Sequence, residues 1–108
     1  MKGDLIDQVR QLIQNMPDTL NLDTLERRKA MIIKIGEASK KHPLYKKTEA
    51  QRNDFYAPLR GLPVEKAILM CWTHFLDRMS NSPTHAHMEG VVVLCFPIIG
   101  DLLKGLGR

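Results

Sequence analysis

The sequence predicts an all-α protein: a single compact domain, residues 1–108, of about five helices with a buried hydrophobic C-terminal helix. Two observations support this fold class. Apolar residues recur at spacings of three and four along most of the chain, which is the pattern of one helix face. In addition, residues 91–103, VVVLCFPIIGDLL, are almost wholly apolar and have Asp101 as their single charge.

The apolar run at 91–103 is expected to be the central element of the core. A helix without a polar face must be enclosed on nearly every side, and these 13 residues are fewer than the about 20 that cross a bilayer. Pro97 argues against a central β-strand. We therefore expect a helix with Ser82 as N-cap, kinked at Pro97, with Gly90 and Gly100 allowing neighbours to approach closely.

The first two helices follow from apolar spacing and capping residues. Asp4 favours the start of the first helix and Pro17 ends it; its apolar face consists of Leu5, Val9, Leu12 and Met16. The second helix is predicted over residues 22–41, with Gly36 on its apolar face. The opposite side of this helix carries a basic stripe at seven-residue spacing, formed by Arg27, Lys34 and Lys41.

Two further helices complete the prediction. A connector, residues 43–47, leads to a third, short helix from Thr48 to Tyr56, because Thr48 and Gln51 form a capping-box pattern. Pro63 suits the first position of a fourth helix. The apolar face of that helix consists of Val64, Ile68, Cys71, Trp72, Phe75 and Met79. The first, second and fourth helices are expected to pack on the fifth.

The charge is concentrated in one part of the chain. The formal net charge is +4, yet residues 27–60 hold ten basic and three acidic residues, a balance of +7, which leaves −3 for the rest. Such asymmetry is typical of a surface that binds a polyanion. The same segment contains Tyr45, Phe55 and Tyr56, which could stack on unpaired bases or belong to the core.

These observations predict a non-catalytic nucleic-acid-binding protein, with RNA favoured over DNA because no helix-turn-helix or homeodomain pattern is present. Phosphate contacts from a basic helix face would recognise shape and charge rather than base sequence. The predicted nucleic-acid-binding residues are Arg27, Arg28, Lys34, Lys40, Lys41, Tyr45, Lys46, Lys47 and Arg52.

Several alternatives remain open at this stage. The basic run can be an ordinary solvated surface, or the pairs at 27–28 and 40–41 a bipartite nuclear import signal. A small helical matrix or adaptor protein could lay the same face on an anionic membrane. A protein-interaction module, such as a homodimer, could use apolar surface around Met31, Ile33 and Met70.

Metal binding and catalysis find little support in the sequence. Cys71, His74, His85 and His87 are candidate zinc ligands, but their helical directions diverge from a common centre. There is no phosphate-binding glycine loop and no nucleophile elbow, so we expect no cofactor, no metal and no enzyme activity.

Compartment is inferred from the first residues and the cysteines. The N-terminus has acidic residues where a signal peptide needs an apolar region. Cys71 and Cys95 lie among apolar residues and are interpreted as reduced core residues, without need of a disulfide. An intracellular protein, cytoplasmic or nuclear, is predicted.

Overall fold

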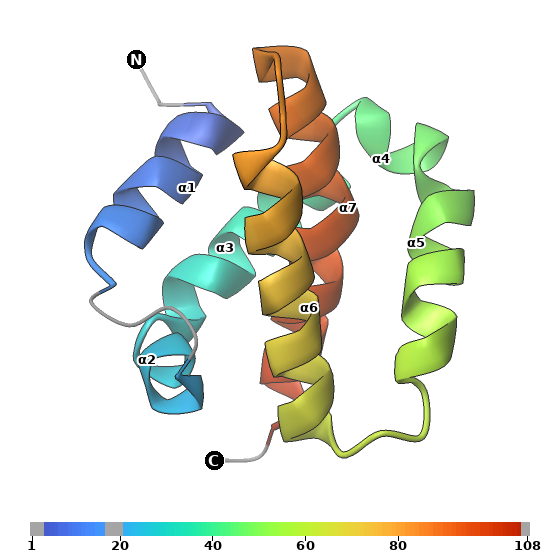
Figure 1. Cartoon of the computed structure of the whole chain (residues 1–108). Helices are drawn as coiled ribbons and strands as arrows, with labels where there is room; N and C mark the ends of the chain where they lie inside the picture. Colours follow the sequence, from blue (N-terminus) through green and yellow to red (C-terminus); the bar gives the residue numbers. More distant parts are fainter. Residues whose placement is uncertain (1–3, 17–20, 107–108) are drawn as a thin grey trace.

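The computed structural model describes residues 4–16 and 21–106; within these ranges 81% of residues are helical and none forms a β-strand. This confirms the predicted all-α fold (Figure 1). The helices are α1 (Leu5–Gln14), α2 (Leu22–Arg27), α3 (Lys29–Lys40), α4 (Leu44–Lys47), α5 (Glu49–Tyr56), the short 3-10 helix η1 (Ala57–Leu59), α6 (Val64–Ser80) and α7 (His85–Lys104).

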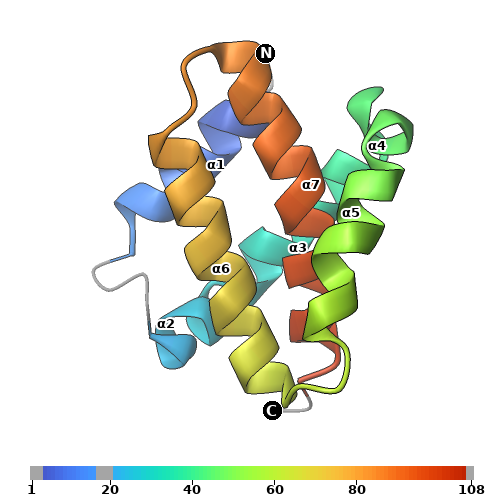
Figure 2. The ribbon, with the colours of Figure 1, turned by 45° about the vertical axis from the view of Figure 1, so that its right-hand side comes forward.

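The central helix is α7, as predicted. It contacts α1, α3, α4, α5 and α6, and every residue from 91 to 100 is buried. In Figures 1 and 2, α6 covers one side of α7, α3 crosses the other side, and α1 and α5 flank the pair. An almost wholly apolar helix is therefore enclosed by the remainder of the chain.

An aromatic cluster fills the space between α6 and α7. Trp72, Phe75 and Phe96 are all fully buried. The ring centroids of Phe75 and Phe96 are 4.9 Å apart, with the ring planes perpendicular, and those of Trp72 and Phe75 are 5.1 Å apart. Edge-to-face geometry of this kind adds to the stability gained from burial alone.

On the other side of α7, the backbone of α3 is in direct contact with it. An added Cβ on Gly36 of α3 would lie only 2.8 Å from the carbonyl oxygen of Phe96. At Gly100 an added Cβ would lie 3.5 Å from Cα of Ile33, which is ordinary van der Waals contact. The predicted close approach at Gly100 is therefore confirmed, whereas the one at Gly90 is wrong, because a Cβ there would meet no atom within 4 Å.

Element boundaries differ from the prediction in four places. Pro63, predicted at the first position of the fourth helix, is the N-cap residue of α6, which begins at Val64. The helix predicted over 22–41 is two helices, because Arg28, at φ −101° and ψ 11°, leaves helical geometry for one residue. The connector at 43–47 contains the short helix α4. The N-cap of α7 is Thr84, whose side chain accepts from the amide of His87, rather than Ser82, whose hydroxyl donates to the carbonyl oxygen of Arg78 at the end of α6.

The start of α1 agrees with the prediction, and its predicted end at Pro17 lies outside the described residues. The carboxylate of Asp4 caps α1 by accepting from the backbone N–H of Asp7 at 2.9 Å, as its position suggested. The same carboxylate lies 3.1 Å from Nε2 of His85 at the start of α7. Helix α1 ends at Gln14, and Pro17, the predicted end of the helix, lies outside the described residues.

Candidate nucleic-acid interface

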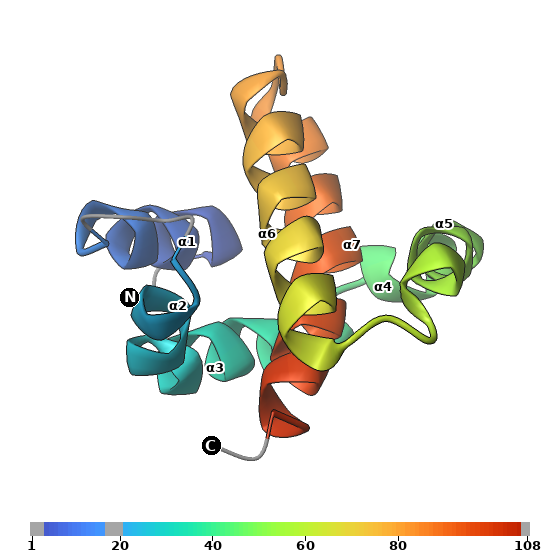
Figure 3. The ribbon, with the colours of Figure 1, turned by 60° about the horizontal axis from the view of Figure 1, so that its bottom comes forward.

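The predicted binding residues lie on or next to α2, α3, α4 and α5; Figure 3 shows α2 and α3 on one side of α7 and α4 on the other side, beside α5. Five cationic side chains of this set are exposed, and within the described ranges none has a hydrogen bond or ion pair. We call these five the basic edge: Arg27 on α2, Lys34 on α3, Lys41 at the α3 C-cap, and Lys46 and Lys47 on α4.

The outward direction of the middle part of the basic edge follows from the periodicity of α3. Residues Ile32, Ile35 and Gly36 are buried against the core. At 100° per residue, Lys34 and Lys41 point about 180° away from them. These two lysines are therefore directed to solvent on the same side of α3, about 10 Å apart along its axis.

Arg28 was predicted to bind nucleic acid, but its guanidinium already has a partner. It donates a hydrogen bond of 2.8 Å from Nη2 to the backbone carbonyl of Asn15, just after α1. The orphan carbonyls at a helix end need such donors, so Arg28 helps to hold α1 beside the α2–α3 junction. We leave it out of the basic edge.

Lys40 also has local partners. Its Nζ lies 3.0 Å from Oδ1 of Asp101 on α7 and 3.0 Å from Oε2 of Glu37 one turn earlier, and Lys104 lies 3.2 Å from the same Glu37 oxygen. The hydrogen bond to Asp101, followed by the one to Glu37, raises the pKa of Lys40. The ammonium group is thus part of an ion network between α3 and α7, so we leave Lys40 out of the basic edge.

Tyr45 and Arg52 form a pair of their own. The guanidinium of Arg52 lies 3.6 Å from the ring centroid of Tyr45 and also donates a hydrogen bond to the hydroxyl of Thr48. Arg52 is only 7% exposed. A cation–π contact on one face of the ring leaves at most the other face for a base. We therefore leave Arg52 out of the basic edge, while Tyr45 keeps one ring face on which a base could stack.

The four candidate zinc ligands do not face a common centre. Cys71 is fully buried, and His74 accepts a hydrogen bond at Nε2 from Nε of Arg78, 3.2 Å away. His85 faces Asp4, and Nδ1 of His87 lies 2.7 Å from the hydroxyl of Ser82. Within residues 4–16 and 21–106, no three His, Cys, Asp or Glu side chains gather in a way that could hold a metal ion.

The two cysteines are free thiols in the core. Cys71 and Cys95 are both fully buried. Burial in apolar surroundings raises the pKa of Cys95 to about 12, and burial followed by the neighbouring Cys95 raises the pKa of Cys71. A thiolate is the reactive form, so neither side chain is set up as a nucleophile.

Features relevant to the membrane and dimer alternatives are also visible. By length and composition alone, α7 could cross a membrane, but so could the core helix of many globular proteins, and its residues 91–100 are covered by the other helices. Of the three apolar residues proposed as a contact surface, Met70 is 46% exposed, whereas Met31 and Ile33 are half-buried.

Comparison with protein-family models, curated proteins and solved structures found no match. The fold and the surface together define a class: a small all-α protein that carries, in the described part of the chain, a set of exposed and unpaired cations, the basic edge. Its function must be argued from these side chains.

Proposed function

We propose that this protein binds nucleic acid without catalysis, through phosphate contacts from the basic edge, with RNA favoured over DNA. The observation that carries the proposal is the presence of five exposed cations without an anionic partner in the described ranges, on three helices that are consecutive in the chain. A cation that is already paired with a carboxylate of the protein is less available to replace the counterions of a nucleic acid, whereas an unpaired cation is free to do so.

The distribution of the basic edge supports contacts along a phosphate backbone. Lys34 and Lys41 project from the same side of α3, two turns apart, and Lys46 and Lys47 continue the series on α4. The α3 helix holds its position because its opposite face is packed on α7. A rigid support of this kind keeps the ammonium groups separated in a fixed pattern.

RNA is favoured because the basic edge is built from short helices and helix ends. None of α2, α3 and α4 exceeds 12 residues, and α3 is covered on its inner face by the core. Contacts from such a surface reach the sugar–phosphate backbone more readily than base edges deep in a DNA major groove. Proteins that bind single strands without sequence preference likewise follow the backbone with basic side chains.

The test is a salt titration of binding to a single-stranded RNA of mixed sequence. If all five cations contact phosphate, log K falls with log salt with a slope of about −3.5. Replacing Arg27, Lys34 and Lys41 together by Gln should reduce this slope by about two units. The melting temperature should change little, since exposed polar substitutions usually alter stability by less than about 0.5 kcal/mol.

A matched control removes the same charge elsewhere. Arg10, Arg60 and Lys66 are exposed and lie outside the basic edge. Their triple Gln variant should bind RNA with nearly the slope of the unmodified protein. Equal losses in both triple variants would mean that net charge alone, not the basic edge, drives binding. Binding to vesicles that contain anionic lipid, without binding to RNA, would favour the membrane alternative.

A further inference from the structure

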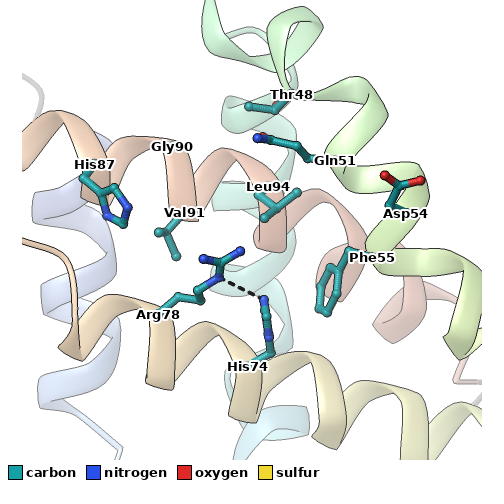
Figure 4. Close-up of a pocket in the computed structure, with 10 residues that line it drawn as sticks. All are labelled: Thr48, Gln51, Asp54, Phe55, His74, Arg78, His87, Gly90, Val91 and Leu94. Carbon is teal, nitrogen blue, oxygen red and sulfur yellow. Dashed lines mark hydrogen bonds between the residues drawn. The ribbon is translucent and has the colours of Figure 1, made fainter.

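A cavity of about 540 Å³ lies between α5, α6 and α7 and is lined by none of the five residues of the basic edge (Figure 4). Its apolar part is formed by Phe55 of α5 and by Val91 and Leu94 of α7. Gly90 also lines it, and an added Cβ there would meet nothing within 4 Å, so the space continues up to the α7 backbone. Cavities of this volume are typical of small-molecule sites.

One guanidinium is directed into this cavity. Arg78 extends from α6 toward α7, between His74 and Val91 (Figure 4). Its Nε donates to Nε2 of His74 at 3.2 Å, and no carboxylate in the described ranges forms an ion pair with it. The two terminal NH₂ groups, which can bind an oxyanion with two parallel hydrogen bonds, are thus not used by an acid of the protein.

His74 fixes the position of this guanidinium. Its ring is stacked on Phe55, with centroids 4.4 Å apart and planes inclined by 29°, so α5 and α6 hold the imidazole between them. Because Nε2 accepts from Arg78, the proton of the neutral ring is on Nδ1. Desolvation by burial, followed by the charge of Arg78, lowers the pKa of His74, so the ring stays neutral at pH 7 and does not repel the arginine.

We propose that this cavity binds a small organic anion, with its carboxylate or phosphate group on Arg78 and an apolar, flat body against Phe55, Leu94 and Val91. Asp54, the acidic residue that lines the cavity, comes from α5, across the cavity from Arg78, and the two form no ion pair (Figure 4). The anionic group is therefore expected at the α6–α7 end of the cavity. This site is independent of the basic edge and of the proposed RNA binding.

Three probes separate the two parts of the proposal. Phenyl phosphate carries both an anion and a ring, inorganic phosphate only the anion, and benzyl alcohol only the ring. Titrations followed by NMR should show phenyl phosphate shifting the amide of Gly90 and the methyl groups of Val91 and Leu94. A dissociation constant of about 5 mM or lower is expected for a ligand of this size, with both partial probes at least about tenfold weaker.

Two variants and a control test the assignment. Arg78→Gln should weaken phenyl phosphate about tenfold or more, as expected for loss of a charged hydrogen-bond pair, while leaving benzyl alcohol unchanged. Gly90→Leu should abolish binding of both by filling the cavity, and the NMR spectrum of each variant establishes that it is folded. Arg10→Gln, which removes an exposed charge on α1, a helix that contributes no lining residue, should have no effect. Equal binding of phenyl phosphate by the Arg78→Gln variant, or shifts outside the cavity, would overturn the proposal.

Discussion

The packing of α3 on α7 predicts opposite effects for the same substitution at two glycines. In Gly36→Ala, the new methyl group would lie 2.8 Å from the carbonyl oxygen of Phe96 and 3.4 Å from its carbonyl carbon. Both are backbone atoms of the central helix, so one helix must move away by a few tenths of an ångström. In Gly90→Ala, the methyl group meets nothing within 4 Å.

The magnitudes follow from two contributions to stability. Replacing a glycine inside a helix by alanine stabilises it by about 0.5–1 kcal/mol, which applies to both positions. At Gly36 the forced displacement of packed backbone costs about 1–3 kcal/mol. The net effect is a loss of about 0.5–2 kcal/mol for Gly36→Ala and a gain of about 0.5–1 kcal/mol for Gly90→Ala.

Thermal unfolding followed by circular dichroism at 222 nm measures both changes. For a chain of 108 residues, 1 kcal/mol corresponds to about 4 °C in melting temperature. We expect Gly36→Ala to melt about 2–8 °C lower and Gly90→Ala about 2–4 °C higher than the unmodified protein. Urea unfolding with an unchanged m-value checks that both remain two-state. A Gly36→Ala variant as stable as the unmodified protein would refute the close approach of α3 and α7.

Three further predictions concern the core, pH and the thiols. Phe75→Ala or Phe96→Ala should cost about 3–5 kcal/mol in urea unfolding, because each ring is fully buried against the other; near-neutral values would contradict this packing. The hydrogen bond from the Asp7 amide lowers the pKa of Asp4 below 3.8, so its stabilising contribution is present above pH 3.8 and is lost as pH falls through the lowered value. Asp4→Asn keeps an N-cap without a charge, so the unmodified protein should lose more unfolding free energy than this variant between pH 5 and pH 2. Parallel plots of unfolding free energy against pH for the two proteins would contradict the role of the Asp4 charge. Cys71 and Cys95 should react with a thiol reagent only after denaturant is added, and rapid reaction in buffer would contradict their burial.

The core was predictable because its signal is local. The unbroken apolar run at 91–103 required enclosure, and the spacing of Ile68, Phe75 and their neighbours set the inner face of α6. The division at Arg28 was not predictable, since the residues on both sides are good helix formers and a single residue leaves helical geometry. Ser82 is as good an N-cap as Thr84, and only its bond to α6 excludes it.

The candidate interface was predictable in composition but not in detail. Exposed lysines at Lys34 and Lys41 follow from helix periodicity. The pairing of Lys40 with Asp101 joins residues 61 positions apart, so it needs the packing of α3 on α7. The burial of Arg52 runs against the strong preference of arginine for the surface.

One contact at the cavity could have been predicted from the sequence. His74 and Arg78 stand four residues apart on one helix, where side chains meet, so their hydrogen bond could have been expected from the sequence. What the sequence could not show is that α5 and α7 leave a space beside this pair. The sequence analysis considered His74 as a candidate zinc ligand and did not pair it with Arg78.

The central place of α7 has a consequence for how the chain acquires its fold during synthesis. Residues 1–84 leave the ribosome before α7, so α1, α3 and α6 are made while the helix that covers their apolar faces does not yet exist. At 5–20 residues per second, the 20 residues of α7 take about 1–4 s to make, and their exit from the ribosome adds to the delay. During this interval the nascent chain exposes the apolar faces that α7 will cover, and exposed apolar surface of this kind favours aggregation until the last helix is added.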